Sequence, residues 1–262
     1  MHQKDWDKEH KKLIAEEKAF LKAGKKDKKN FLTQKVEQYV PESVCDKLNA
    51  AFVKGFELVF SKGAPIVEKT YSKTKYEEDF KIHRFTMETR KRNGLSGFKK
   101  KANSASRRNI LISGAEGACF GVLGIGLPDI PVFIGVLMKT VQEIALSYGY
   151  DYNTEEEKIF MLKLIRTAMS QGEFRIAENR SMGKLICGIE NETRSLNEEI
   201  AATAKVLSDR LLYLKFIQGI PLVGLVGGLS DFTVTKEISG YARLVYKKRF
   251  LRKLWKEREG QI

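Results

Sequence analysis

Apolar residues recur along this chain at the three- and four-residue steps of an α-helix rather than at the two-residue step of a strand. No run of alternating apolar and polar residues bounded by turn signals occurs, and the chain has only five prolines. After Pro41, one series of apolar positions predicts the buried face of a helix: Val44, Leu48, Ala51, Phe52, Phe56, Val59 and Phe60. The pattern predicts an all-α protein of about ten helices.

The N-terminal part of the chain differs from the rest in its charge pattern. A first predicted helix, over residues 6–22, is charged on most of its surface, and GKKDKKN over residues 24–30 has the composition of a solvated linker. We therefore expect residues 1–30 to form a charged helix or loosely attached arm, and residues 31–262 to form one helical domain. Within that domain a further helix is predicted over residues 65–90.

The least polar part of the chain covers residues 117–138, whose only charge is Asp129. This run is long enough for a transmembrane helix. Pro128 and Pro131 flank Asp129, however, and should divide the run into two helices that are each too short to cross a bilayer alone. We therefore expect a helical hairpin, whose second arm ends at Gly149 in the left-handed conformation that caps many helices.

A second glycine-rich hairpin is predicted around IPLVGLVGGLSDF. Glycines fall at helical steps in both hairpins: Gly117, Gly121 and Gly124 in the first, and Gly224 and Gly228 in the second. A glycine costs a helix about 1 kcal/mol relative to alanine, and close packing of helix axes supplies a compensating gain. Such packing occurs in soluble cores and in lipid, so both settings stay open.

Positive charge is concentrated on either side of the apolar centre. The chain has 47 Lys and Arg against 33 Asp and Glu, a net charge of +14. Residues 81–108 contribute +9 and residues 243–258 contribute +7, whereas residues 109–242 carry −4. Flanking basic segments are typical of proteins that contact anionic lipid headgroups. The residues predicted to bind lipid or another anion are Lys99, Lys100, Lys101, Arg107, Arg108, Lys247, Lys248, Arg249, Arg252 and Lys253.

Nucleic acid is the competing anionic partner. Phe98, Phe250 and Trp255 lie among the basic residues and could stack on bases. No helix-turn-helix, zinc-finger or RNA-binding sheet motif accompanies them. Tyr246, Phe250 and Leu254 also recur every four residues, as the buried face of a helix does. The pattern therefore favours lipid over nucleic acid.

Few residues are candidates for catalysis. The sequence has no nucleophile-elbow, zinc-protease or phosphate-loop motif, and its three isolated cysteines and three histidines favour neither a disulfide framework nor a zinc site. We expect no cofactor and no metal. Three carboxylates in apolar surroundings could act as acids or bases if burial raised their pKa: Glu116, Asp129 and Asp231.

These carboxylates also have structural interpretations. Asp129 and Asp231 are placed to cap the helices that follow them, and Thr154 and Glu157 have the spacing of a capping box. Glu116 interrupts an uncharged face, so it should pair with a base, bond to backbone or line a cavity. A hydrolase or lipid-modifying enzyme that uses Glu116 and Asp129 is the alternative to a non-catalytic protein.

The segment GAEGACFGVLGIGLPDIP, its continuation to SYGYD and the later IPLVGLVGGLSDF together resemble the EcsC family of bacterial proteins. The resemblance covers about residues 39–251 and leaves out the first thirty residues. Its recognisable positions here are Gly117, Gly121, Asp129, Gly149 and Asp151. The family's first named member is encoded beside an ABC transporter, so the resemblance implies a membrane-proximal setting and a membrane-protein partner such as that transporter. It implies no settled activity and no catalytic residue set.

These observations predict an all-α, multi-helix single domain built around two glycine-rich helical hairpins. The N-terminus has no apolar segment of the secretory type, so we expect a cytoplasmic protein, peripheral at the inner face of the cell membrane. Its expected function is binding of anionic phospholipid, or support of a transporter-linked membrane machine, without catalysis of its own. The enzyme above and a nucleic-acid-binding module are the alternatives.

Overall fold

Helices make up all the regular secondary structure of the described residues, which confirms the all-α prediction. The computed structural model describes residues 3–25, 40–63, 72–90, 95–122, 130–189, 194–217 and 229–260. In chain order the elements are α1 (Gln3–Lys25), α3 (Glu42–Leu58), the short π-helical turn η1 (Val59–Gly63), α5 (Lys73–Arg90), α6 (Leu95–Val122), α7 (Ile130–Ser147), α8 (Glu155–Met169), α9 (Gly172–Cys187), α10 (Leu196–Ile217) and α11 (Leu229–Arg258).

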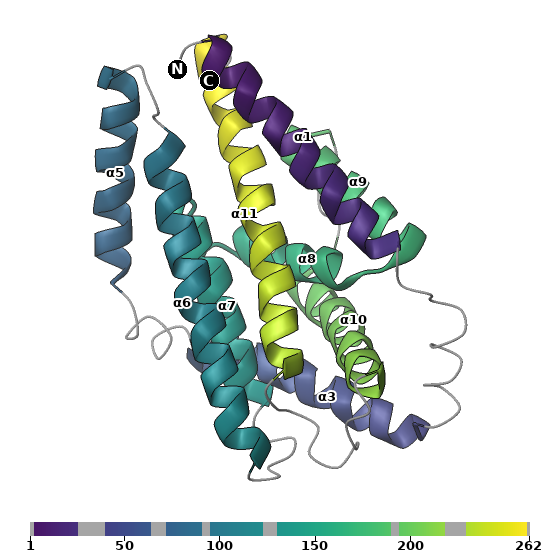
Figure 1. The fold of residues 1–262 in the computed structure, drawn as a ribbon. Coiled ribbons are helices and arrows are strands. Elements are labelled where there is room, and N and C mark those ends of the chain that lie inside the picture. The colour runs from purple at the N-terminus through teal and green to yellow at the C-terminus, as the bar shows by residue number, and fades with distance from the viewer. Residues whose placement is uncertain are drawn as a thin grey trace.

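The long helix α11 runs through the middle of the bundle (Figure 1) and packs against α6, α7 and α8. On one side α10 packs against α8 and α3, and on another α1 covers parts of α9 and α11. Helix α5 lies at an edge, beside α6 and α7. The apolar faces of these helices form one core. That core includes the predicted α3 stripe, in which Leu48, Phe52, Phe56 and Val59 are buried.

Helix α7 is buried over most of its length. Within the described ranges it is the one helix whose length and composition would suit a membrane span. Its apolar residues pack into the core, as Ile134 and Leu137 show with no exposed surface. Its buried polar residues are also bonded: Asn109 donates to the Glu143 carboxylate, and the Ser147 hydroxyl donates to the Glu143 carbonyl at 2.7 Å. Burial within the bundle accounts for the composition of α7.

The end of α7 is capped as the sequence predicts. Gly149 has a φ of 78°, in the left-handed region. The Tyr150 amide donates to the Ala145 carbonyl at 3.0 Å, and the Gly149 amide donates to the Leu146 carbonyl at 2.9 Å. A side chain at this position would also meet the Phe80 ring. Both the backbone conformation and the close approach of α5 therefore require glycine here.

The capping box predicted at Thr154 is half formed. The Thr154 hydroxyl accepts a hydrogen bond from the Glu157 amide at 3.2 Å. The Glu157 carboxylate instead accepts hydrogen bonds from Tyr246 at 2.7 Å and from Arg249. A complete capping box occurs at Ser195, where the Ser195 amide donates to the Glu198 carboxylate at 2.7 Å and the Glu198 amide donates to the Ser195 hydroxyl at 3.4 Å. The S-x-x-E spacing could have predicted this second box.

Helix α1 is a charged helix, as one of the two expectations for the N-terminus had it, and it is docked on the bundle. Leu13 is 4% exposed. The Phe20 ring stacks on Tyr241 with ring centroids 4.2 Å apart, and the Arg175 guanidinium lies 4.5 Å from the Phe20 ring centre. The periodic apolar side of α1 therefore belongs to the common core. The boundary predicted at residue 30 lies outside the described residues.

Helices α6 and α7 pack against each other, and α6 continues through the basic segment into the apolar centre. The LPDIP corner between them lies largely outside the described residues. Gly117 and Gly121 lie in α6, whereas Gly124, Gly224 and Gly228 fall outside the described ranges. Close packing by the glycine stripes therefore stays a prediction.

Candidate anion-binding pocket between α1, α6 and α11

The two basic segments, far apart in sequence, lie side by side because α6 and α11 are antiparallel. The Phe98 and Phe250 ring centroids are 4.8 Å apart, and further along the pair Arg243 donates a hydrogen bond to Ser106. Phe98 and Phe250 are both buried. Trp255 packs against Trp6 with ring centroids 5.2 Å apart. The aromatic residues that could have stacked on bases are therefore occupied in packing.

Half of the basic residues predicted to bind an anion are paired with acids of the protein itself. The pairs are Lys99 with Glu9, Lys101 with Asp79, Lys247 with Glu9 and Glu16, Lys248 with Glu17, and Arg249 with Glu157. Three of these acids belong to α1. Carboxylates of the N-terminal helix thus neutralise Lys99 on α6 and Lys247 and Lys248 on α11.

Glu9 shows how closely the helices are coupled. Burial by itself would raise the pKa of Glu9, but the hydrogen bond and charge of Lys99, with the charge of Lys247, hold that pKa below its usual value. Burial lowers the pKa of Lys99, and Glu9 opposes that change. One carboxylate of α1 therefore joins α6 to α11.

The other predicted basic residues differ in their surroundings. Lys100, Arg107 and Lys253 are exposed, and none of them has an ion pair with a described residue. Arg252 donates to the Cys187 carbonyl at 3.0 Å. Arg108 lies in α6, but its side chain is outside the described part of the structure.

A pocket of about 920 Å³ lies between α1, α6 and α11. Its charged lining residues are Lys12, Glu16, Lys99, Lys236, Glu237, Arg243 and Lys247. Lys236, Arg243 and Lys247 fall at helical steps on one face of α11, with Gly240 between them. Phe20, Tyr148 and Leu244 supply apolar and aromatic wall. We call this the cationic pocket.

Arg243 is one of three cations of the pocket that have no ion pair with a described residue. Its guanidinium donates to the Ser106 hydroxyl, and no carboxylate of the described residues lies within ion-pair distance. Burial lowers the pKa of Arg243, Tyr148 and Glu16 oppose this change, and Arg107 adds to it. Tyr148 is 3% exposed, and burial raises the pKa of its hydroxyl well above the usual range. The hydroxyl is therefore a neutral donor next to a partly buried cation.

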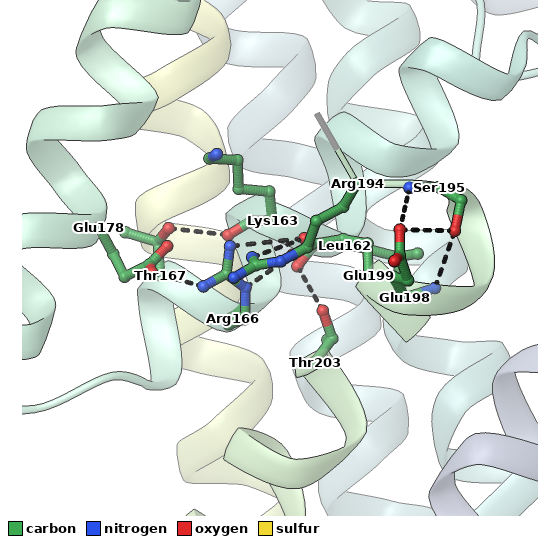
Figure 2. A network of polar contacts seen from close by, with 10 residues as sticks. All are labelled: Leu162, Lys163, Arg166, Thr167, Glu178, Arg194, Ser195, Glu198, Glu199 and Thr203. Atoms are coloured by element: carbon green, nitrogen blue, oxygen red, sulfur yellow. Dashed lines mark hydrogen bonds and ion pairs between the residues drawn. The ribbon is translucent and has the colours of Figure 1, made fainter. Parts of the chain in front are cut away.

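A second polar cluster joins α8, α9 and α10 (Figure 2). Arg166 donates to Glu199 at 2.7 Å and also binds Glu178, and Arg194 donates to Glu199 at 3.1 Å. Glu199 has no exposed surface. Glu178 and Glu199 both face the Arg166 guanidinium, so this cluster holds three helices together.

The structure does not describe a site that contains the three carboxylates predicted as catalytic candidates. Glu116 lies in α6, but its side chain is outside the described part of the structure, as is the whole of Asp129. Asp231 lies in the first turn of α11 rather than at its N-cap, since α11 begins at Leu229. The residues that the structure describes contain no cluster of three or more His, Cys, Asp or Glu that could hold a metal.

Arg243 lies in one of the two basic segments of the sequence, but neither Arg243 nor Tyr148 was predicted as a site residue. The spacing of Lys236, Arg243 and Lys247 indicates one face of a helix. Their meeting with Lys12 and Tyr148 depends on contacts between distant helices, which no local signal in the sequence predicts.

The fold and the pocket together define an all-α protein with a polar, partly cationic pocket beneath its N-terminal helix. The sequence profile of the EcsC protein family matches residues 4–251, and the chain belongs to this family. The match begins at residue 4, so the expectation that the first thirty residues lie outside the family is wrong. The physical reason is that α1 packs into the core and supplies the acids that pair with α6 and α11.

Two curated proteins of Bacillus subtilis (strain 168) are similar to the chain. The uncharacterized protein YdbA is 26% identical over 155 residues, covering 56% of this chain and 56% of YdbA. Protein EcsC is 27% identical over 144 residues, covering 54% of this chain and 58% of EcsC. The chain thus spans somewhat more than half the length of these relatives. No solved structure matches it significantly.

Proposed function

We propose that the protein is a non-catalytic protein of the membrane surface that binds anionic phospholipid at the inner face of the cell membrane. The position of four helix ends carries the proposal. Helix α6 ends at Val122 and α11 begins at Leu229, and because the two helices are antiparallel these ends lie together. Figure 1 places the start of α7 and the end of α10 at the same end of the bundle.

These four helix ends adjoin the two glycine-rich segments of the sequence. The segment 123–129 has Asp129 as its one charged residue, and the segment 218–228 has none. Apolar segments with so little charge are suited to enter the headgroup region of a bilayer. The net charge of +14 favours an anionic leaflet.

The fold adds a constraint on orientation. Along α6, Lys101 lies about 30 Å from Val122, given a rise of 1.5 Å per residue. Charges in water are largely screened beyond about 8 Å at physiological salt. A molecule that stands on this end therefore gains little from the exposed Lys100, whereas a molecule that lies along the membrane can use it. The two orientations differ in the salt dependence of binding.

Co-sedimentation with vesicles tests the proposal. Vesicles of phosphatidylcholine alone are compared with vesicles that also contain phosphatidylglycerol, at low and at high salt. We expect binding only to the anionic vesicles, with a part that survives high salt. Absence of binding to both kinds of vesicle at both salt concentrations contradicts the proposal.

Variants separate the apolar and the electrostatic contributions to vesicle binding. Ile125→Asp with Leu222→Asp should remove the salt-resistant part, because it places charge in the two apolar segments. Lys100→Gln with Lys253→Gln should weaken the salt-sensitive part if the bundle lies along the membrane. The matched control is Lys47→Gln with Lys54→Gln, which removes the same charge from exposed positions on α3.

A further inference from the structure

We propose that the cationic pocket between α1, α6 and α11 is a binding site for a phosphate group, with the Arg243 guanidinium as its principal contact. This site is distinct from the apolar end of the bundle, and the inference does not depend on membrane association. The ligand chemistry is that of a phosphate ester, whether free in solution or on a lipid headgroup.

The charges of the pocket do not cancel. Its two lining acids are already engaged by bases: Glu16 pairs with Lys247 at 3.4 Å, and Glu237 lies 3.4 Å from Arg210 and 3.7 Å from Arg175. Lys12, Lys236 and Arg243 have no ion pair with any described residue. Three cations therefore line the pocket without a carboxylate to neutralise them.

Arg243 is oriented for a ligand. Its Nη1 atom is held by the Ser106 hydroxyl, and the guanidinium makes no other hydrogen bond to a described residue. Gly240 lies beside the guanidinium, since a Cβ atom built there would lie 4.0 Å from the Arg243 Nη2 atom. A planar guanidinium with free N–H groups matches the geometry of phosphate oxygens.

The remaining surroundings fit a phosphate ester rather than an inorganic ion alone. The buried Tyr148 hydroxyl can donate a hydrogen bond to an anion. Phe20, Ala15 and Leu244 supply apolar wall for an organic substituent. The volume of about 920 Å³ lies in the range of small-molecule sites, about 300 to 1,000 Å³.

Isothermal titration calorimetry of the full chain tests the inference, with inorganic phosphate, glycerol 3-phosphate and monomeric dihexanoyl phosphatidylglycerol as probes. We expect saturable binding of at least one probe and at least tenfold weaker binding to Arg243→Gln. Arg180→Gln is the matched control, since Arg180 is an exposed arginine of α9 outside the pocket. A lipid affinity more than tenfold above that of glycerol 3-phosphate identifies a headgroup site, and comparable affinities identify a site for free phosphate esters.

A second variant guards against a folding defect. Tyr148→Phe removes only a hydroxyl and should also weaken binding, while circular dichroism and thermal unfolding verify that each variant is folded. No saturable binding of any probe, or equal binding by wild type and a folded Arg243→Gln variant, overturns the inference. The titrations contain no bilayer, so their outcome is independent of the vesicle experiment.

Discussion

Arg249 donates from Nη1 to both carboxylate oxygens of Glu157, at 2.8 and 2.6 Å. Its guanidinium also lies over the rings of Tyr150 and Phe160, at 4.2 and 4.3 Å from their centres. Tyr246 donates a further hydrogen bond to Glu157. The charge of Arg249 suggests contact with an anionic partner, but in the structure Arg249 connects α11 to α8 through Glu157. Its removal should therefore lower the stability of the fold.

Arg249→Gln should destabilise the protein by about 2 kcal/mol, because a largely buried carboxylate loses its charged hydrogen-bond partner. Urea unfolding followed by circular dichroism measures this change. Lys253→Gln, at an exposed position on the same helix, should change the free energy of unfolding by less than about 0.5 kcal/mol. Equal effects of the two substitutions would show that Arg249 does not stabilise the α8 and α11 contact.

Glu199→Gln should be more damaging, by about 3 kcal/mol, because it removes the charge that faces Arg166 in the buried cluster of Figure 2. Among the described residues, Arg166 would keep only Glu178 as an acidic partner. Thermal unfolding compared with Glu156→Gln, at an exposed position on α8, measures the difference. An unchanged melting temperature in Glu199→Gln would contradict a structural role for the cluster.

Three glycine substitutions should separate backbone strain from steric contact. Gly149→Ala should cost more than about 1 kcal/mol, because its φ is 78° and the added methyl group would meet Phe80. Gly188→Ala has a similar φ of 65° but no atom within 4 Å, so it should cost less. Gly240→Ala lies inside α11 with its nearest neighbour 4.0 Å away and should stabilise the helix by up to about 1 kcal/mol. Chemical unfolding of the three variants measures the change in the free energy of unfolding. Any order other than Gly149→Ala most destabilising, then Gly188→Ala, then Gly240→Ala contradicts this separation of backbone strain from steric contact.

Glu9 should give the attachment of α1 a dependence on pH. Its folded-state pKa lies below the ordinary value of 4.5, because Lys99 and Lys247 outweigh the effect of burial. Such a carboxylate stabilises the fold above its unfolded pKa, and this contribution is lost as the pH falls through the folded pKa. The free energy of unfolding should therefore fall more steeply between about pH 5 and pH 3 in the wild type than in Glu9→Gln. Urea unfolding across this range tests the difference, and parallel profiles would contradict it.

Local signals predicted the helices well. The stripe from Val44 to Phe60 is buried or partly buried as expected, Gly149 caps α7, and Thr154 caps α8. These features depend on residues a few positions apart, so their physical causes are present in the sequence itself. The predicted end of the first helix differs by three residues from that of α1, because the ends of helices depend weakly on local sequence.

The candidate site could be predicted only in part. The basic residues of α6 and α11 were selected from charge alone, yet Lys99, Lys247 and Lys248 pair with acids of α1. Those pairs join residues 90 to 238 positions apart in sequence. The sequence pattern of a basic segment does not predict which distant acidic residues will pair with its lysines.

The sequence by itself determined that this protein is helical, which faces of its helices are apolar, and that it carries a large excess of positive charge. Hydrophobic periodicity and capping residues act over one or two turns, so these properties are already fixed at that range. Only the tertiary structure decided which charges cancel. By docking α1 over α6 and α11, it neutralises Lys99, Lys247 and Lys248 but leaves Arg243 without an acid of the described residues, because the balance of a charge depends on what packs within a few ångströms of it.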